Sequence, residues 1–257
     1  PLSRGALIGN SLQCGYHGLV VGADGRCTRV PTSSTVPDWA RVKRYPVAEL
    51  DGYLWVWMGA AELADPSLVT RFPCNSDPGR AVARGELRVE AHYQLIIDNL
   101  LDLSHAQYLH AGSLGNDDFY RAKSDVEVQG MTVWDRRTVY DTTQTPALEH
   151  ILGPGRRVDF TMDARVTPPG EYLLTVYVRP PGRPREDGGM FDSVQLLTPE
   201  TRTSTLYHWN LCRNYDIANA QLTAFWQQAV ATAFLDDKAM IEAQQRAVGS
   251  HEIVAHG

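Results

Sequence analysis

Two histidines, His105 and His110, lie five residues apart in an apolar part of the chain. Neutral imidazoles are good ligands for iron, zinc and copper. Asn99, Asp102 and His105 follow one another at intervals of three residues, which predicts that they share one face of a helix. His110 lies about 140° further round an ideal helix. Both imidazoles can therefore meet one metal only if the helix bends, ends or carries a π-bulge. The alternative is an amphipathic helix with two structural histidines.

A carboxylate near the C-terminus could complete such a site. Asp236 and Asp237 are adjacent in a helical pattern, and Met240 and Ile241 follow Asp237 at i+3 and i+4. This spacing places Asp237 on the buried side, where an unpaired carboxylate is costly, while Asp236 is predicted to face solvent. Two histidines and one carboxylate form the facial triad of non-haem Fe(II) oxygenases, which leaves coordination positions open for O₂.

The second candidate metal site is Cys14-Gly15-Tyr16-His17-Gly18. Its glycines permit a tight loop in which the thiolate and the imidazole point at one metal. Zinc would require four such ligands, so one cysteine and one histidine make half a site. Taken alone, this motif is weak.

Composition limits the partners. The 257 residues carry a net charge of −6 with a pI near 5.7, so we expect no nucleic acid or acidic membrane surface as a partner. No apolar run approaches the length of a membrane span. Four scattered cysteines without a disulfide-framework spacing are typical of a reducing cytoplasm, where we expect the protein.

The order of elements predicts an α+β fold with an antiparallel sheet. Residues 9–59 read as short strands separated by turns, a small β domain or part of one. A helix is expected around the two histidines, strands follow over residues 124–213, and a helical pattern runs from Ile217 to Gln245. The domain boundary is predicted after residue 62, giving domains 1–62 and 63–257.

The combined motifs resemble those of the Rieske non-haem iron oxygenases. The residues that carry this resemblance are Cys14-Gly15-Tyr16-His17-Gly18, then Asn99-x2-Asp102-x2-His105-x4-His110, then Asp236-Asp237-Lys238. Within that family, Trp55-Val56-Trp57-Met58-Gly59 and Leu197-Thr198-Pro199-Glu200 look especially like the vanillate O-demethylase oxygenase group, which includes dicamba monooxygenase.

The resemblance implies a fold and a set of metal ligands. Residues 1–62 would form the second half of a Rieske β domain, and residues 63–257 a helix-grip-like catalytic domain. Cys14 and His17 would bind a Rieske [2Fe–2S] cluster, while His105, His110 and Asp237 would hold a mononuclear Fe(II) ion.

Two polar residues would assist that iron. The Asp102 carboxylate would hydrogen-bond His105 and, across a subunit interface, His17 of a neighbouring chain, and so link the two metal centres. Asn99 would lie near the iron. Inter-subunit electron transfer requires an oligomer, which the resemblance implies to be a homotrimer.

The sequence departs from the family pattern at one point. The family's first cluster pair, Cys-x-His, is not in it, and we expect that pair to precede Pro1 in a longer protein. The other interpretation is that the polypeptide has lost its route of electron entry.

The implied function is that of the terminal oxygenase of a two-component system. A flavin- or ferredoxin-type reductase would deliver electrons from NAD(P)H, and O₂ would be used to O-demethylate a small methoxylated aromatic acid to a phenol and formaldehyde. Gln195 matches a position that can contact the substrate carboxylate, and Trp226, with Phe225, could wall an aromatic pocket. For each of these three, ordinary strand or core packing is the alternative.

Other functions remain open. A member of the same family could hydroxylate a ring or a methyl group and release no formaldehyde. A non-catalytic protein could hold zinc with two histidines and one carboxylate. The polypeptide could also be an inactive fragment.

Overall fold

The structure is a computed structural model that describes residues 2–115, 118 and 122–249. It consists of two compact units, Pro1–Val69 and Thr70–Gly257. The predicted domain boundary lies after residue 62, and residues 63–69 group with the first unit. This short segment contains the 3₁₀ turn Pro66–Leu68, capped by the Asp65 carboxylate, which accepts a hydrogen bond from Ser67 N.

The first unit consists of short antiparallel strands. Four of them form one sheet in sequential order, and two form a separate hairpin. The strands are β1 (Ala6–Ile8), β2 (Ser11–Gln13), β3 (Val20–Gly22), β4 (Cys27–Arg29), β5 (Val47–Leu50) and β6 (Tyr53–Val56). The 3₁₀ turns are η1 (Leu2–Arg4), η2 (Ala61–Leu63) and η3 (Pro66–Leu68). The Cys14–Gly18 motif forms the loop between β2 and β3.

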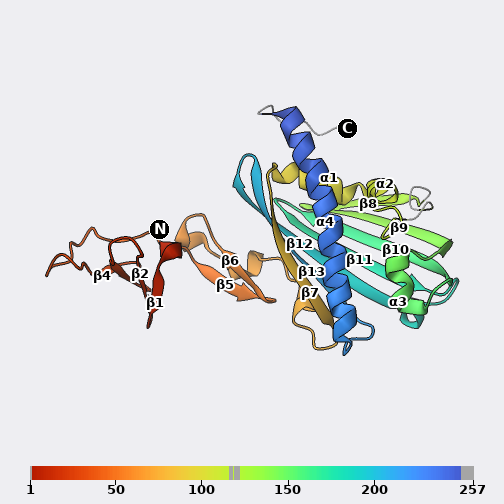
Figure 1. The fold of residues 1–257 in the computed structure, drawn as a ribbon, viewed down its shortest axis with the longest axis horizontal. Coiled ribbons are helices and arrows are strands. Elements are labelled where there is room, and N and C mark those ends of the chain that lie inside the picture. Colours follow the sequence, from red (N-terminus) through yellow and green to blue (C-terminus); the bar gives the residue numbers. More distant parts are fainter. Residues whose placement is uncertain (1, 116–117, 119–121, 250–257) are drawn as a thin grey trace. The chain divides into compact units, whose positions relative to one another are not determined.

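The second unit is built on a seven-stranded antiparallel sheet in the order β7-β13-β12-β11-β10-β9-β8 (Figure 1). Its strands are β7 (Ala81–Val89), β8 (Ser124–Gln129), β9 (Thr132–Thr143), β10 (Arg157–Thr167), β11 (Glu171–Arg179), β12 (Gly189–Thr201) and β13 (Ser204–Arg213). The sheet and its helices confirm the predicted α+β class.

The helices of the second unit are short except for the last one. They are α1 (Tyr93–Leu101), α2 (Ala106–Leu109), α3 (Glu149–Leu152) and α4 (Ala220–Val248). The 3₁₀ turns are η4 (Pro73–Asn75), η5 (Leu103–His105), η7 (Pro146–Leu148) and η8 (Arg185–Asp187). Helix α4 packs against β7 and α1. Over the described part of the chain, no helix is long and apolar enough to cross a bilayer.

Apolar side chains of the sheet, α1 and α4 form one core. Ile96 of α1, Val178 of β11 and Trp226 of α4 are each at most 1% exposed, and burial of such a side chain stabilises the fold by about 1.5–3 kcal/mol. On β13, the Trp209 indole contacts Phe234 of α4 at 5.8 Å between ring centroids. This aromatic contact fixes α4 three residues before Asp237.

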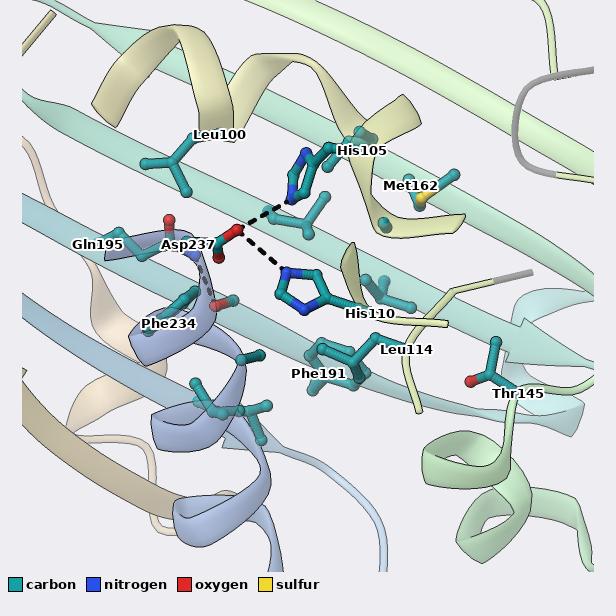
Figure 2. A pocket seen from close by; sticks show the side chains of 18 of the residues that line it. Leu100, His105, His110, Leu114, Thr145, Met162, Phe191, Gln195, Phe234 and Asp237 are labelled. Carbon is teal, nitrogen blue, oxygen red and sulfur yellow. Dashed lines mark hydrogen bonds and ion pairs between the residues drawn. The ribbon is translucent and has the colours of Figure 1, made fainter. Parts of the chain in front are cut away.

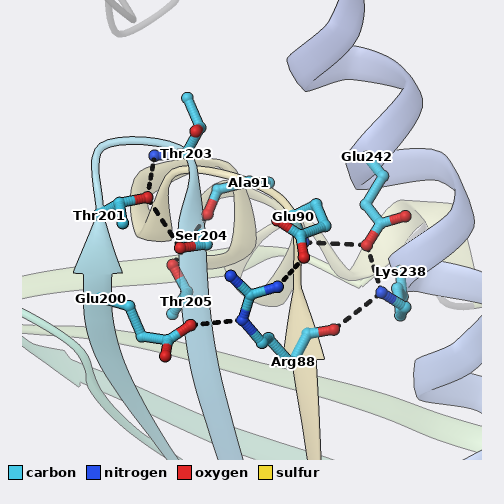
Figure 3. A network of polar contacts seen from close by, with 10 residues as sticks. All are labelled: Arg88, Glu90, Ala91, Glu200, Thr201, Thr203, Ser204, Thr205, Lys238 and Glu242. Atoms are coloured by element: carbon cyan, nitrogen blue, oxygen red, sulfur yellow. Dashed lines mark hydrogen bonds and ion pairs between the residues drawn. The ribbon is translucent and has the colours of Figure 1, made fainter.

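A polar network fixes the same helix to the segment that leads into α1 (Figure 3). Lys238 Nζ donates to the Arg88 carbonyl at 2.8 Å and also to Glu242. Glu242 Oε1 in turn accepts from Glu90 N at 2.9 Å. One turn further on, Gln245 Oε1 accepts from His92 N at 2.8 Å. These contacts join α4 to the end of β7 and the start of α1.

Gly85 of β7 leaves the space that the Trp209 indole fills. Gly85 and Trp209 are paired across the strands, and a Cβ at Gly85 would lie 2.3 Å from Trp209 Cζ2. We therefore expect Gly85→Ala to lower the free energy of unfolding by about 1–3 kcal/mol through overpacking, measured by urea denaturation.

Glu86→Ala is the matched control, because the neighbouring Glu86 side chain is 81% exposed. Its unfolding free energy should stay within about 0.5 kcal/mol of wild type. Equal stability of Gly85→Ala and Glu86→Ala would contradict this packing.

Candidate metal centre and its cavity

The helical segment is interrupted at Asp102, between α1 and the two histidines. Helix α1 ends at Leu101, and Asp102 adopts φ −89° and ψ 81°, outside the helical region. The Asp102 carboxylate accepts from Ser104 N at 3.0 Å and so caps η5. Helix α2 follows and ends at His110, which has φ −109° and ψ 27°. The expectation of a bent or ended helix is confirmed, but the expectation that Asn99, Asp102 and His105 share one helix face is wrong.

The break brings both imidazoles to one carboxylate of α4 (Figure 2). Asp237 Oδ1 lies 3.1 Å from His110 Nε2 and 3.4 Å from His105 Nε2. The two rings are 5.3 Å apart and nearly perpendicular, at 77°. Asp237 and His110 are buried, and His105 is half-buried. The structure therefore brings together the three residues that the sequence singled out, while Asp236 is exposed as expected.

His105 is oriented by the main chain. Its Nδ1 donates to the carbonyl oxygen of Asp102, which leaves Nε2 to face Asp237 as a potential ligand atom. The prediction placed the Asp102 carboxylate on His105, and within the chain this is wrong. That carboxylate is engaged by Ser104, which is also the main reason that the pKa of Asp102 is lowered.

Asn99 supports the carboxylate. Its Nδ2 donates to Asp237 Oδ1 at 3.3 Å, from the last turn of α1. A buried carboxylate needs such donors, because burying it unpaired is costly. The sequence predicts only that Asn99 lies near the metal. The structure shows that it hydrogen-bonds one of the three candidate ligands.

The three side chains fit a divalent transition metal. One donor atom from each lies within 4.8 Å of the others. In octahedral coordination, ligands at about 2.1 Å from the metal are roughly 3 Å from their neighbours. The two distances to Asp237 Oδ1 already have this size. The donor set, with two neutral imidazoles and one carboxylate, is that of a facial triad with open positions.

The triad lies in the wall of an apolar cavity of about 140 Å³. An engineered apolar cavity of roughly 150 Å³ holds one benzene molecule, so this space accommodates a single aromatic ring. The apolar lining comes from the broken helix, the sheet and α4. It comprises Leu100, Leu103, Ala106, Leu114, Leu148, Phe160, Met162, Leu174, Val176, Phe191, Leu211, Trp226, Val230, Ala233 and Phe234.

The predicted substrate-contacting residues divide into two groups. Gln195 and Trp226 line the cavity. Phe225 is 40% exposed, contacts His150 and is absent from the described lining. The reason is helical geometry, because adjacent residues of α4 point in directions about 100° apart.

Sequence reasoning missed three polar residues of the cavity, namely Thr145, Tyr172 and Ser193. Alternation along strands gives a weak signal for two of them. Tyr172, Leu174 and Val176 share one face of β11, and Ser193 and Gln195 share one face of β12. Which strands are neighbours, and which face meets α4, could not be read from that alternation.

The Cys14–Gly18 loop forms the tight turn that its glycines predict. Gly18 has φ +70°, and its N–H donates to the Cys14 carbonyl at 3.0 Å. Backbone N–H groups, that of Tyr16 first and that of His17 next, lower the pKa of the half-buried Cys14 thiol. The loop therefore favours a thiolate, the form that binds metal.

Comparisons with known proteins agree with this geometry. Residues 89–254 match the vanillate O-demethylase oxygenase C-terminal domain. The chain belongs to the vanillate O-demethylase oxygenase family. A vanillate O-demethylase oxygenase subunit from Pseudomonas sp. (strain ATCC 19151) is 34% identical over 256 residues, which are 96% of this chain and 78% of that protein.

Solved structures of this family show the same fold. Dicamba monooxygenase bound to dicamba is 31% identical, with a TM-score of 0.90, and the match covers 100% of this chain and 77% of that one. Dicamba monooxygenase with non-haem iron and dicamba is 29% identical, with a TM-score of 0.79, over 100% and 76% of the two chains. The predicted fold and the predicted class of aromatic oxygenase are thereby confirmed.

The geometry of the triad predicts selective metal-dependent stabilisation. With Fe(II) added anaerobically at a hundredfold excess over its dissociation constant, the wild-type protein should gain about 2.7 kcal/mol of stability. Asp237→Ala should lose this gain, because it removes the atom that both imidazoles face. Thermal unfolding with and without Fe(II) measures the effect.

Asp236→Ala is the control, since Asp236 directly precedes Asp237 on the same helix and is exposed. It should respond to Fe(II) as wild type does. If Asp236→Ala loses the stabilisation and Asp237→Ala keeps it, the wrong carboxylate has been assigned to the site.

Proposed function

We propose that this protein is the terminal oxygenase that O-demethylates a small methoxylated aromatic compound to a phenol and formaldehyde. The observation that carries the proposal is the triad of His105, His110 and Asp237 in the wall of a cavity large enough for one aromatic ring. Family membership supports the reaction, because a relative of this chain is named a vanillate O-demethylase oxygenase subunit.

The metal that we propose for the triad is Fe(II). The donor set fits it, and a related solved structure is that of dicamba monooxygenase with non-haem iron. When bound, iron would supply the activation of O₂ and the oxidation of the methoxy carbon. The methoxy carbon gains one oxygen atom, and the resulting hemiacetal splits into a phenol and formaldehyde, with two electrons and two protons reducing the second oxygen atom to water.

The protein's own residues hold and orient the metal ligands and enclose the aromatic ring. The Asp102 carbonyl accepts a hydrogen bond from His105 Nδ1 and so keeps Nε2 directed toward Asp237. Asn99 donates a hydrogen bond to Asp237. The apolar lining excludes water and positions the ring beside the triad, an entropic contribution that can lower a barrier by several kcal/mol. A non-catalytic zinc protein would need the same three ligands but gives no reason for the aromatic-sized cavity.

Electron supply is the second part of the proposal. Cys14 and His17 fit two of the four ligands of a Rieske [2Fe–2S] cluster, and the loop amides that favour the Cys14 thiolate support this assignment. Residues 1–62 would then be the Rieske part and residues 63–257 the catalytic part. Electrons would come from NAD(P)H through a flavin- or ferredoxin-type reductase.

The assembly that we propose is a homotrimer in the cytoplasm. Asp102 is exposed on the break between α1 and η5, and in the proposed trimer its carboxylate would contact His17 of a neighbouring subunit. Such a contact would link the cluster of one subunit to the iron of the next. The four cysteines are free, which suits a reducing compartment.

We expect the full-length, iron-loaded protein with reductase and NADH to release formaldehyde from methoxylated aromatic compounds. Formaldehyde and the phenol should form in amounts equal to the substrate consumed, measured by a colorimetric assay and chromatography. Oxygen consumption that yields hydroxylated rings or alcohols without formaldehyde would replace this proposal by a hydroxylase function. No O₂-dependent turnover with iron bound would favour the non-catalytic alternative.

Asp102→Asn tests the link between subunits. Asparagine is as good a helix cap as aspartate, so the break, the triad and iron content should be retained. Loss of the charged acceptor should lower kcat by about 10–100-fold with little change in KM.

Asp98→Asn is the matched variant, because it makes the same acid-to-amide change at an exposed position of α1. It should turn over normally. Near-normal kcat in Asp102→Asn, with iron content equal to wild type, would contradict a role in electron transfer.

A further inference from the structure

The cavity contains buried hydroxyls whose hydrogen-bonding capacity the protein does not use. Tyr172 is 1% exposed and Thr145 is 2% exposed, and both line the cavity. Within the described residues, neither the Tyr172 hydroxyl nor Thr145 Oγ1 has a hydrogen-bond partner. A buried polar group left unsatisfied costs about 1–3 kcal/mol. These two hydroxyls therefore indicate a polar ligand that forms hydrogen bonds with them.

Gln195 presents a third unused donor. The Tyr207 hydroxyl donates to Gln195 Oε1 at 3.1 Å, and Gln195 Nε2 donates to Ser193 Oγ at 2.9 Å. Because Nε2 carries two hydrogens, one remains available. Tyr207 is a positioning residue here, since its hydroxyl determines which end of the amide is the oxygen.

Tyr172 and Gln195 line the same part of the cavity wall. They are directly paired across β11 and β12, so their side chains lie side by side on one face of the sheet. Thr145 contributes from the segment before η7, and Figure 2 shows it on the other side of His110 from Gln195. The cavity thus offers neutral hydrogen-bonding groups from two parts of its wall.

The described lining contains no lysine or arginine to pair with an anion. Its one carboxylate, Asp237, carries the opposite charge to that required. On the same face of the sheet, Arg137 of β9 pairs with Met162 of the cavity wall, but its guanidinium is bound to Asp135 at 2.7 and 2.8 Å. Removing an ionised carboxylate from water costs several kcal/mol when no cation receives it.

We propose that this cavity selects an uncharged aromatic methyl ether, held by Tyr172 and Gln195, over the corresponding aromatic carboxylate. This inference rests on the proposed O-demethylation and replaces the predicted aromatic acid by a neutral substrate of the same shape. Burial keeps Tyr172 in its neutral form, since it raises the pKa of that hydroxyl. The iron of the triad would add positive charge beside Asp237, so the comparison must include the iron-loaded enzyme.

The test uses two isosteric probes, 4-hydroxy-3-methoxybenzamide and 4-hydroxy-3-methoxybenzoate. In the full-length, iron-loaded enzyme, kcat/KM for formaldehyde release should favour the amide by at least about tenfold. Calorimetric binding to the metal-free protein should rank the two in the same order. Equal or tighter binding of the benzoate, or its faster turnover, overturns the inference.

The two proposals fail separately. Faster turnover of the benzoate leaves O-demethylation intact and rejects only the charge preference. If neither probe yields formaldehyde, the proposed function fails, and the calorimetric ranking still decides the preference.

Substitutions test which residues recognise the substrate. Tyr172→Phe should weaken binding of the amide about tenfold, while Gln195→Lys should reverse the preference in favour of the benzoate. Tyr177→Phe is the matched control, because Tyr177 lies on the opposite face of β11, with Arg185 4.0 Å from its ring, and its binding should be unchanged. An unchanged preference in Gln195→Lys would show that Gln195 does not face the substrate.

Discussion

The second unit depends on the burial of one carboxylate, Asp237, between two imidazoles. A carboxylate that is 5% exposed is tolerated only when paired, and its partners come from a segment more than a hundred residues earlier in the chain. The interaction therefore fixes α4 against the broken helix. Contacts at both sides maintain it, with the Trp209–Phe234 packing before Asp237 and the Lys238 and Glu242 network after it.

The break in the helix has a local cause and a distant consequence. The Asp102 carboxylate caps η5, and the Asp102 carbonyl orients His105, so one residue both ends α1 and sets the direction of an imidazole. Both histidines follow this break, His105 on η5 and His110 at the end of α2. The sheet then supplies the floor of the cavity, with β11 and β12 placing Tyr172 beside Gln195.

Much of this arrangement could be predicted from the sequence, because it follows from local spacing. The spacing of the two histidines, the buried position of Asp237 and the need for the helix to bend or end near the histidines all follow from helical periodicity. What could not be predicted depends on contacts between distant segments. The sequence does not show that Asp102 uses its carbonyl rather than its carboxylate toward His105, that Phe225 points away from the cavity, or that Tyr172 and Thr145 enter it.

The central claim is that His105, His110 and Asp237 bind iron together. A crystal of the full-length protein loaded anaerobically with Fe(II), measured on both sides of the iron absorption edge, tests it directly. The account predicts an anomalous peak within bonding distance of His105 Nε2, His110 Nε2 and an Asp237 carboxylate oxygen. The absence of any iron peak there, in a crystal whose solution sample contained stoichiometric mononuclear iron, would contradict the account.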